Sequence, residues 1–361
     1  MSLPSLPSGV NETWFTELLR SEGLLTTEQS VTSVTREQVG DGTGMMSELS
    51  RLRVTYDGEV DLPNTFVIKY PSQNENNREI AMSYHLYERE VRYFAELDPI
   101  TSAYSPKPYV TKLEGDNFLI LMEDMSDYRV GDQASGANLA DTHAAVDELA
   151  KLHGAFWNNV EDLGWVPGIA DSYHADNMAT LVEVGWPQMC EIFKDFIDPE
   201  VAAIGDRFCA QIRRLQAEMH SAPVTLLHGD FRMENIFFGD EPGQRPIAIF
   251  DWQGPLIGRG MVDVALMLGQ STRTEVRQAH ERELVNRYVK GLNEVGGLDS
   301  KYDEEMAWQD YECAMLYNWV YTGVVAGTLD VHNDKAFAWM SQMVARHSKA
   351  SLDLDVLRFL T

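Results

Sequence analysis

Three oxygen-bearing side chains stand close together in the second half of the sequence. Asp230 is followed by Asn235 five positions later, and Asp251 ends the next apolar run. A loop aspartate can accept the proton of an attacking hydroxyl, whereas an asparagine and a second aspartate can hold magnesium against phosphate oxygens. The pattern predicts Asp230 as a catalytic base and Asn235 with Asp251 as magnesium ligands. The chemistry that needs such a set is phosphoryl transfer.

Short apolar segments flank these polar residues. They read TLL at 225–227, IFF at 236–238 and IAIF at 247–250. Runs of this kind, rich in β-branched and aromatic residues, are typical of strands. Strands on both sides would hold the polar loop rigidly, which is what the positioning of reacting groups requires.

The first third of the chain predicts a sheet and a helix. Apolar residues recur three or four apart from Asn77 to Leu97, which predicts one long helix. Polar turns containing Gly, Asn or Pro separate several β-rich runs, which favours antiparallel pairing. The strands predicted in this way lie at 31–39, 49–56, 65–70, 109–113 and 118–122.

The rest of the chain is mainly helical, beginning with an amphipathic run at 140–158. A chain of 361 residues is long enough for two cores. We therefore predict an α+β fold of two lobes, with an antiparallel sheet plus one long helix in a small N-terminal lobe and a larger, mainly helical C-terminal lobe. The predicted boundaries are a tail and helix at 1–30, an N-lobe at 31–125 and a C-lobe at 126–361.

The loop HGDFRMEN at 228–235, together with Asp251, resembles the HGDxxxxN loop and following aspartate of the aminoglycoside phosphotransferase and choline kinase superfamily. Asp-Trp-Gln at 251–253 is similar to the DFQ of its ecdysteroid-kinase-like members, where protein kinases have DFG. The resemblance covers about Val31 to Ser271. It implies a protein-kinase-like fold, ATP and Mg²⁺ as cofactors, and transfer of the γ-phosphate to a hydroxyl group of a small molecule.

The resemblance also implies a lysine and a glutamate that serve the nucleotide. Lys69, at the end of a predicted strand, matches the lysine that orients the α- and β-phosphates, and Glu90 matches the glutamate that pairs with it. Glu79 and Glu88 lie on the same predicted helix and compete for this role. Glu90 is preferred because aromatic residues flank it, and an exposed helix charge is the alternative reading.

A glycine-dense turn at 40–44 precedes the lysine-bearing strand. Gly42 and Gly44 would permit the close backbone approach that covers phosphates, although a plain hairpin turn is the default for such a pattern. Ser47 would add a hydroxyl contact to a phosphate. These three residues are predicted to bind the nucleotide.

The segment LILMEDM at 119–125 resembles the lobe connection of the family, whose backbone groups hold the adenine edge. It makes Met122, Glu123 and Met125 the predicted adenine contacts. Met122 suits a place in the core equally well, because backbone groups rather than side chains would make these contacts.

Three more polar residues are expected to support the site rather than react. His153 lies among apolar neighbours on a predicted helix and is interpreted as a satisfied core histidine. His228 is expected to shape the loop by hydrogen bonding, since Asp230 already supplies a proton acceptor. Asp263 is expected to brace the loop or to cap a helix.

The composition excludes several partners. The chain has 29 Lys+Arg against 56 Asp+Glu, and its net charge of -27 would repel nucleic acid. Its three cysteines form no CxxC pair, so neither a disulfide framework nor a zinc site is indicated. No apolar stretch is long enough to span a bilayer, and no signal peptide is recognisable. The sequence predicts a cytoplasmic protein with no membrane partner, and it does not indicate the oligomeric state.

Other classes of protein fit less well. A protein kinase would carry HRD, DFG and APE, and a P-loop enzyme would carry GxxxxGK[ST], none of which occurs. A nucleotide-binding pseudokinase remains an alternative, but it would usually lack one of Lys69, Asp230 or Asp251.

The acceptor is left open by the motifs. The resemblance favours a neutral, partly apolar alcohol, whereas the acidic composition would suit an aminoglycoside- or choline-like cation. Aromatic residues that would line an acceptor pocket or pack in the core are Trp252, Trp308, Tyr317, Trp319 and Tyr321.

Overall fold

The computed structural model describes residue 3 and residues 9–40, 46–296, 302–329 and 333–360. The chain divides into two compact units. The first, here called the sheet unit, takes in Met1–Ile100, Ser105–Asp127 and Asp251–Gln253. The second, the helical unit, takes in Thr101–Tyr104, Tyr128–Phe250 and Gly254–Thr361. Antiparallel strands followed by a mainly helical remainder confirm the predicted α+β fold.

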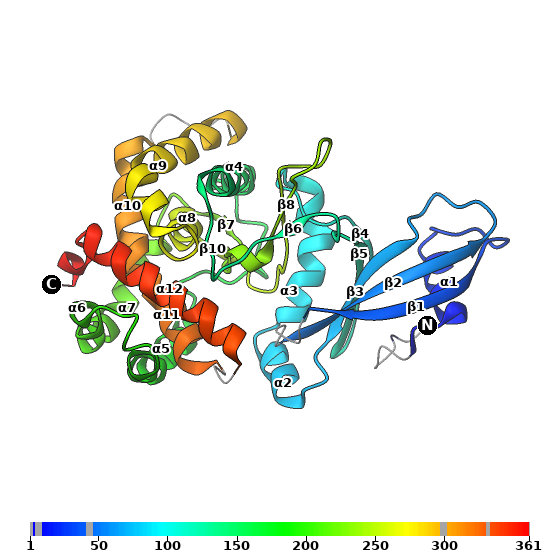
Figure 1. The fold of residues 1–361 in the computed structure, drawn as a ribbon, viewed down its shortest axis with the longest axis horizontal. Helices are drawn as coiled ribbons and strands as arrows, with labels where there is room; N and C mark the ends of the chain where they lie inside the picture. Colours follow the sequence, from blue (N-terminus) through cyan, green and yellow to red (C-terminus); the bar gives the residue numbers. More distant parts are fainter. Residues whose placement is uncertain (1–2, 4–8, 41–45, 297–301, 330–332, 361) are drawn as a thin grey trace. The chain divides into compact units, whose positions relative to one another are not determined.

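The sheet unit contains five antiparallel strands in the order β1-β2-β3-β5-β4 (Figure 1). Their bounds are β1 (Ser30–Val39), β2 (Ser47–Asp57), β3 (Thr65–Pro71), β4 (Pro108–Glu114) and β5 (Asn117–Glu123). Each of the five strands predicted from the sequence is therefore confirmed. Lys69 on β3 pairs in register with Leu49 on β2 and with Ile120 on β5, so it lies within the sheet rather than at its edge.

One face of the sheet is covered by α1 (Glu12–Ser21), as Figure 1 shows. The Asn11 side chain caps this helix by accepting from the Trp14 N–H at 3.0 Å. Phe15 packs in one core cluster with Phe66 and Ile68 of β3. Because successive strand residues point to opposite faces, Lys69 points away from α1.

The prediction of a single helix from Asn77 to Leu97 is wrong. The chain forms α2 (Glu75–Ser83) and α3 (Leu86–Arg92), followed by a π-helical turn (Tyr93–Leu97) and a 3₁₀ turn (Asp98–Ile100). His85 separates the two helices with a left-handed φ of 55°. The Ser83 hydroxyl also bonds to the Ile80 carbonyl oxygen at 2.8 Å, a local bond that competes with helix continuation.

The helical unit contains most of the helices and several short strands. Its longer helices are α4 (Leu139–Ala155), α5 (Ser172–Ile192), α7 (Gly205–Met219), α9 (Thr274–Gly296), α10 (Glu304–Tyr317), α11 (Trp319–Thr328) and α12 (Asp334–Asp353). Its shorter helical elements are α6 (Pro199–Ala202), the 3₁₀ turn Met233–Asn235, α8 (Met261–Leu266), the π-helical turn Met267–Ser271 and the 3₁₀ turn Val356–Phe359. Its strands are β6 (Arg129–Val130), β7 (Thr225–Leu227), β8 (Ile236–Phe238), β9 (Ile247–Ile249) and β10 (Leu256–Gly258).

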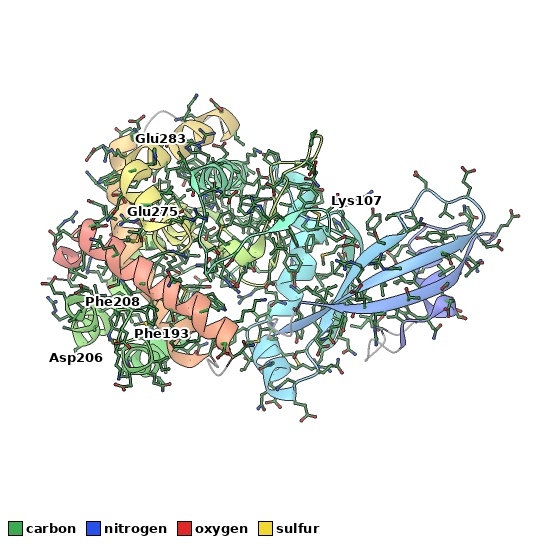
Figure 2. The ribbon with its side chains drawn as sticks, in the orientation of Figure 1. Lys107, Phe193, Asp206, Phe208, Glu275 and Glu283 are labelled. Atoms are coloured by element: carbon green, nitrogen blue, oxygen red, sulfur yellow. The ribbon has the colours of Figure 1, made fainter. Side chains whose placement is uncertain are left out.

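Amphipathic helices build the core of this unit. On α7, Phe208 is fully buried whereas Asp206 in the first turn is exposed, and both are labelled in Figure 2. Phe193, just after α5, is also fully buried. Within the part of the chain that the structure describes, no helix combines the length and apolar character needed to cross a bilayer.

Two small sheets fix the polar loop of the helical unit. Strand β7 pairs with β10, and β8 pairs with both β6 and β9. The loop at 228–235 therefore runs from one small sheet to the other. Anchored at both ends by strands, it has little freedom to move.

Candidate active site

Asp263 of α8 holds the start of the polar loop. Its buried carboxylate accepts from the backbone N–H of His228 at 2.7 Å and of Gly229 at 3.1 Å. The predicted bracing by Asp263 is thereby confirmed. His153 Nε2 lies 3.3 Å from the same carboxylate, and its Nδ1 lies 2.7 Å from the Tyr288 hydroxyl. His153 is fully buried with both ring nitrogens bonded, as expected of a satisfied core histidine.

Gly229 turns the loop in a way that only glycine accommodates. Its φ is 81°, and a Cβ built there would lie 2.1 Å from the Gly254 carbonyl oxygen. The ring of His228 spans the turn, with Nε2 at 3.0 Å from the Phe250 carbonyl oxygen and Nδ1 at 3.3 Å from the Asp230 N–H. His228 thus shapes the loop, as predicted, and links it to Phe250, the residue directly after β9.

Three side chains donate hydrogen bonds to the Asp230 carboxylate, whose side chain is 30% exposed. Asn235 Nδ2 lies 2.9 Å from Oδ2 and 2.9 Å from the Asp230 carbonyl oxygen. Arg232 Nε lies 3.2 and 3.4 Å from the two carboxylate oxygens, and the Tyr321 hydroxyl donates to Oδ1. The structure therefore places the predicted base beside the predicted metal ligand Asn235.

Sequence reasoning missed the roles of Arg232 and Tyr321 at this carboxylate. Arg232 also pairs with Glu234 and lies over the ring of Trp339 at 4.7 Å. Tyr321 comes from α11, 91 positions along the chain from Asp230. The sequence marks it only as a pocket or core aromatic, and no sequence pattern links it to the loop.

In the sheet unit, Lys69 lies between two carboxylates. Its Nζ is 2.6 Å from Glu90 Oε1 and 2.8 Å from Asp251 Oδ1, and Lys69 and Glu90 are essentially fully buried. Burial lowers the pKa of Lys69, but Asp251 and Glu90 outweigh it and raise that pKa overall. For Glu90, burial raises the pKa and Lys69 lowers it, with burial prevailing. The pairing of Lys69 with Glu90, rather than with Glu79 or Glu88, is as the sequence indicated.

Asp251 sits at a strained point of the backbone. Its φ is 67°, in the left-handed region that few residues other than glycine adopt. The next residue, Trp252, is fully buried and stacks on Tyr93 with 3.6 Å between ring centroids and 7° between planes. Its Nε1 donates to the Ser105 hydroxyl at 3.1 Å. Trp252 therefore anchors the segment and holds Asp251 against Lys69.

The predicted phosphate-cover residues are placed only in part. Gly42 and Gly44 lie outside the described residues. Ser47 begins β2, is buried, and has its hydroxyl 3.2 Å from Gln253 Nε2. Ser47 thus links β2 to the segment that carries Asp251.

The predicted adenine contacts lie at the end of β5. Met122 and Met125 are both buried. The Glu123 N–H already donates to the Lys107 carbonyl oxygen at 2.9 Å, and its carboxylate accepts from the Lys107 N–H at 3.1 Å. The Met125 N–H has no hydrogen bond to any residue in the described ranges. Met125 is therefore the better placed of the three to donate to a base.

The oxygen donors present suit magnesium. In the helical unit, Asn235 uses its amide nitrogen for both of its bonds to Asp230, and its Oδ1 bonds to none of the described residues. In the sheet unit, Asp251 has a partly exposed carboxylate. Mg²⁺ typically takes one or two such protein oxygens and completes its shell with phosphate and water. Across the residues placed in the structure, no group of three or more His, Cys, Asp or Glu could hold a metal ion.

Comparison with known proteins identifies relatives of this site. The model of the ecdysteroid kinase-like family matches residues 41–297. A search of curated proteins gave no match.

Several solved structures share the fold at low sequence identity. A protein of Ralstonia eutropha JMP134 assigned as an aminoglycoside phosphotransferase has a TM-score of 0.55 at 15% identity, covering 96% of this chain and 99% of that one. The Plasmodium vivax ethanolamine kinase has a TM-score of 0.51 at 15% identity, with 92% and 87% covered. A mutant of aminoglycoside 2′-phosphotransferase-IIIa, solved with GDP, has a TM-score of 0.54 at 12% identity, with 94% and 97% covered.

Proposed function

Because this chain belongs to the ecdysteroid kinase-like family, we propose that it uses ATP and magnesium to phosphorylate a hydroxyl group of a neutral small molecule. The family establishes the reaction class, which is phosphoryl transfer from a nucleotide to a small-molecule hydroxyl. The nucleotide, the metal and the acceptor are the proposed part.

One observation carries the proposal: a buried lysine held between two carboxylates in the sheet unit. Lys69 lies 2.6 Å from Glu90 and 2.8 Å from Asp251. A buried charge persists only where partners compensate its desolvation, so a lysine at 1% exposure marks a built charge site. Phosphoryl transfer supplies the reason for such a site, because a fixed cation must orient phosphate oxygens.

In the proposed reaction, Lys69 orients the α- and β-phosphates while Glu90 holds its ammonium in place. Asp251 and Asn235 would hold Mg²⁺, which when bound neutralises charge on the phosphate oxygens. The backbone at Met125 would contact the adenine edge. Ser47, with Gly42 and Gly44, would cover the phosphates.

Asp230 acts on the acceptor. Its carboxylate positions the substrate hydroxyl and takes its proton as the oxygen attacks the γ-phosphorus. The three donors around it fix the orientation of the carboxylate before substrate binds. Preorganisation of this kind lowers the barrier without reorganisation at the moment of reaction.

The acceptor proposed here is neutral because Asp230 already has a cation beside it. Arg232 lies within 3.4 Å of both Asp230 oxygens and also pairs with Glu234. The guanidinium already compensates the charge of Asp230, so this carboxylate needs no cationic group of the acceptor beside it. A neutral alcohol is therefore sufficient.

The test begins with thermal unfolding, since a ligand that binds only the folded state raises its stability. Mg-ATP is expected to raise the melting temperature, and Asp251→Asn should weaken that rise. A panel of neutral alcohols and of amine-bearing alcohols is then screened with ATP, and phosphorylated products are identified by mass. Phosphorylation of amine-bearing alcohols alone would refute the neutral acceptor.

Asp230→Asn separates chemistry from binding. The variant is expected to lower turnover by about 10²-fold or more while keeping the Mg-ATP stabilisation, because the base acts mainly in the transition state. Asp240→Asn is a matched control, since Asp240 is exposed and pairs only with Arg129 among the residues described. Unaltered turnover in Asp230→Asn would exclude Asp230 as the base.

A further inference from the structure

Tyr321 holds the catalytic carboxylate with a hydroxyl group, the same kind of group that an acceptor would bring. Its O–H donates to Asp230 Oδ1, while Asn235 Nδ2 lies 2.9 Å from Oδ2. Arg232 Nε contacts both oxygens at 3.2 and 3.4 Å. An incoming hydroxyl must therefore share or replace one of these donors. Of the three donors, only Tyr321 donates through a hydroxyl, so an alcohol can take over its hydrogen bond to Asp230 with the same kind of group.

Neighbouring residues of α8 fix both partners of this bond. The Val262 carbonyl oxygen accepts from Asn318 Nδ2 at 2.9 Å, next to the start of α11. Asp263, the next residue, accepts from the backbone N–H of His228 and Gly229, just before Asp230. One short helix thus sets the position of the loop and of the helix that carries Tyr321.

Close packing against α5 fixes the register of α11. A Cβ built on Gly185 would lie 2.4 Å from the Gly323 carbonyl oxygen, and one on Gly327 would lie 2.1 Å from the Gly185 carbonyl oxygen. Such backbone contact requires glycine at these positions. On the same helix, the Thr322 hydroxyl lies 2.7 Å from His347 Nδ1. The Tyr321 hydroxyl is therefore placed by its surroundings rather than by a freely turning helix.

Toward the Asp230 carboxylate, the Tyr321 hydroxyl can only donate. Burial and the negative charge of Asp230 raise the pKa of its phenol well above the ordinary value. The hydroxyl stays protonated at working pH and cannot take a proton from a substrate. It can hold the carboxylate and keep water from the same oxygen.

We propose that Tyr321 is a positioning residue that caps Asp230 until an acceptor hydroxyl takes its place, and that it thereby suppresses transfer of the phosphoryl group to water. This inference rests on the proposed function. In the suppressed reaction, a water oxygen would bond to the γ-phosphorus, the bond from phosphorus to the β-phosphate oxygen would break, and a water proton would pass to Asp230.

The experiment measures ATP hydrolysis by the full chain with Mg-ATP and no acceptor. Tyr321→Phe is expected to raise hydrolysis about tenfold, since a hydrogen bond to a charged group contributes roughly that factor to occupancy. Tyr302→Phe is the matched control, because Tyr302 is also buried and its hydroxyl also donates to a carboxylate, that of Asp310, with 3.0 Å to Oδ2. It should leave hydrolysis unchanged.

Two further variants exclude a general loosening of the site. Adding Asp230→Asn to Tyr321→Phe should abolish the gain in ATP hydrolysis, because a water that replaces the tyrosine hydroxyl needs the Asp230 carboxylate to take its proton. If Tyr321→Phe does not fold, Tyr321→Leu replaces it with the same expectation. Equal or lower hydrolysis in the folded variant overturns the inference about Tyr321. If Mg-ATP still stabilises that variant, the proposed function survives, and if Mg-ATP stabilises neither protein, both fail.

Discussion

Replacing Lys69 with methionine separates the structural role of the buried charge site from its role in nucleotide binding. In Lys69→Met, Glu90 keeps a fully buried carboxylate and loses its ammonium partner 2.6 Å away. Removing one partner of a buried pair costs about 3–5 kcal/mol of unfolding free energy. For a unit of this size we expect the melting temperature to fall by roughly 10–20 °C.

The deficit should depend on pH in a definite direction. Burial raises the pKa of Glu90, and Lys69 is the nearest group that lowers it, so the lysine's removal raises it further. A carboxyl whose pKa is higher in the folded chain takes up a proton on folding, and stability then increases as the pH falls toward the unfolded value. Melting curves from pH 8 to pH 5 should therefore show the difference from the wild type shrinking.

A double variant completes the test. Lys69→Met with Glu90→Leu removes both charges and should recover most of the lost stability, because a matched apolar pair can replace a buried ion pair. It should not recover stabilisation by Mg-ATP, since the phosphate-orienting lysine is absent. Lys112→Met is the control, as Lys112 forms only a partly exposed pair with Glu22 among the described residues. If Mg-ATP raised the melting temperature of the double variant as much as that of the wild type, the reasoning would be refuted.

Three other substitutions test the support of the site. Gly229→Ala should destabilise the chain by about 2 kcal/mol or more in urea unfolding and abolish turnover, because its Cβ would meet the Gly254 carbonyl oxygen at 2.1 Å. Asp263→Asn should lower turnover by about 10²-fold in a coupled assay while Mg-ATP still raises the melting temperature, since it misplaces the loop only. Burial lowers the pKa of His347 to about 4. Between about pH 6.5 and pH 4, His347 is therefore neutral in the folded chain and protonated in the unfolded chain. Stability should fall by about 3 kcal/mol as the pH drops from about 6.5 to 4, and His347→Gln should remove this dependence.

The fold was largely predictable because its strongest signals are local. Five strands and α1 follow from periodic apolar residues over short runs. The prediction of one long helix was wrong at His85, whose left-handed φ of 55° ends the helix. The spacing of apolar residues continues unchanged beyond this break. Periodicity reports which face is apolar, and it does not detect a break that preserves the face.

The candidate site was predictable only where a motif joins its members. Asp230 and Asn235 lie five positions apart in one loop, so the motif singled out both residues, and the structure shows them in contact. Resemblance to a family supplied the pairing of Lys69 with Glu90, but the contact of Lys69 with Asp251 across 182 positions was not predicted. Tyr321 has no motif, and its bond to Asp230 across 91 positions required coordinates. Contacts set by helix packing leave no trace in local spacing.

The side chains proposed to take part in the reaction depend on neighbours with no proposed part in it. Trp252 anchors Asp251 through its stacking on Tyr93, and Asp263 anchors Asp230 through two backbone bonds. Both anchors are buried, so packing and hydrogen bonds within the protein, rather than contacts with substrate, hold them in place. Within each unit, the anchored side chain can therefore stay in place while residues that contact the acceptor change. Changes in acceptor specificity should therefore arise around Tyr321 and Arg232, while the anchors stay as they are.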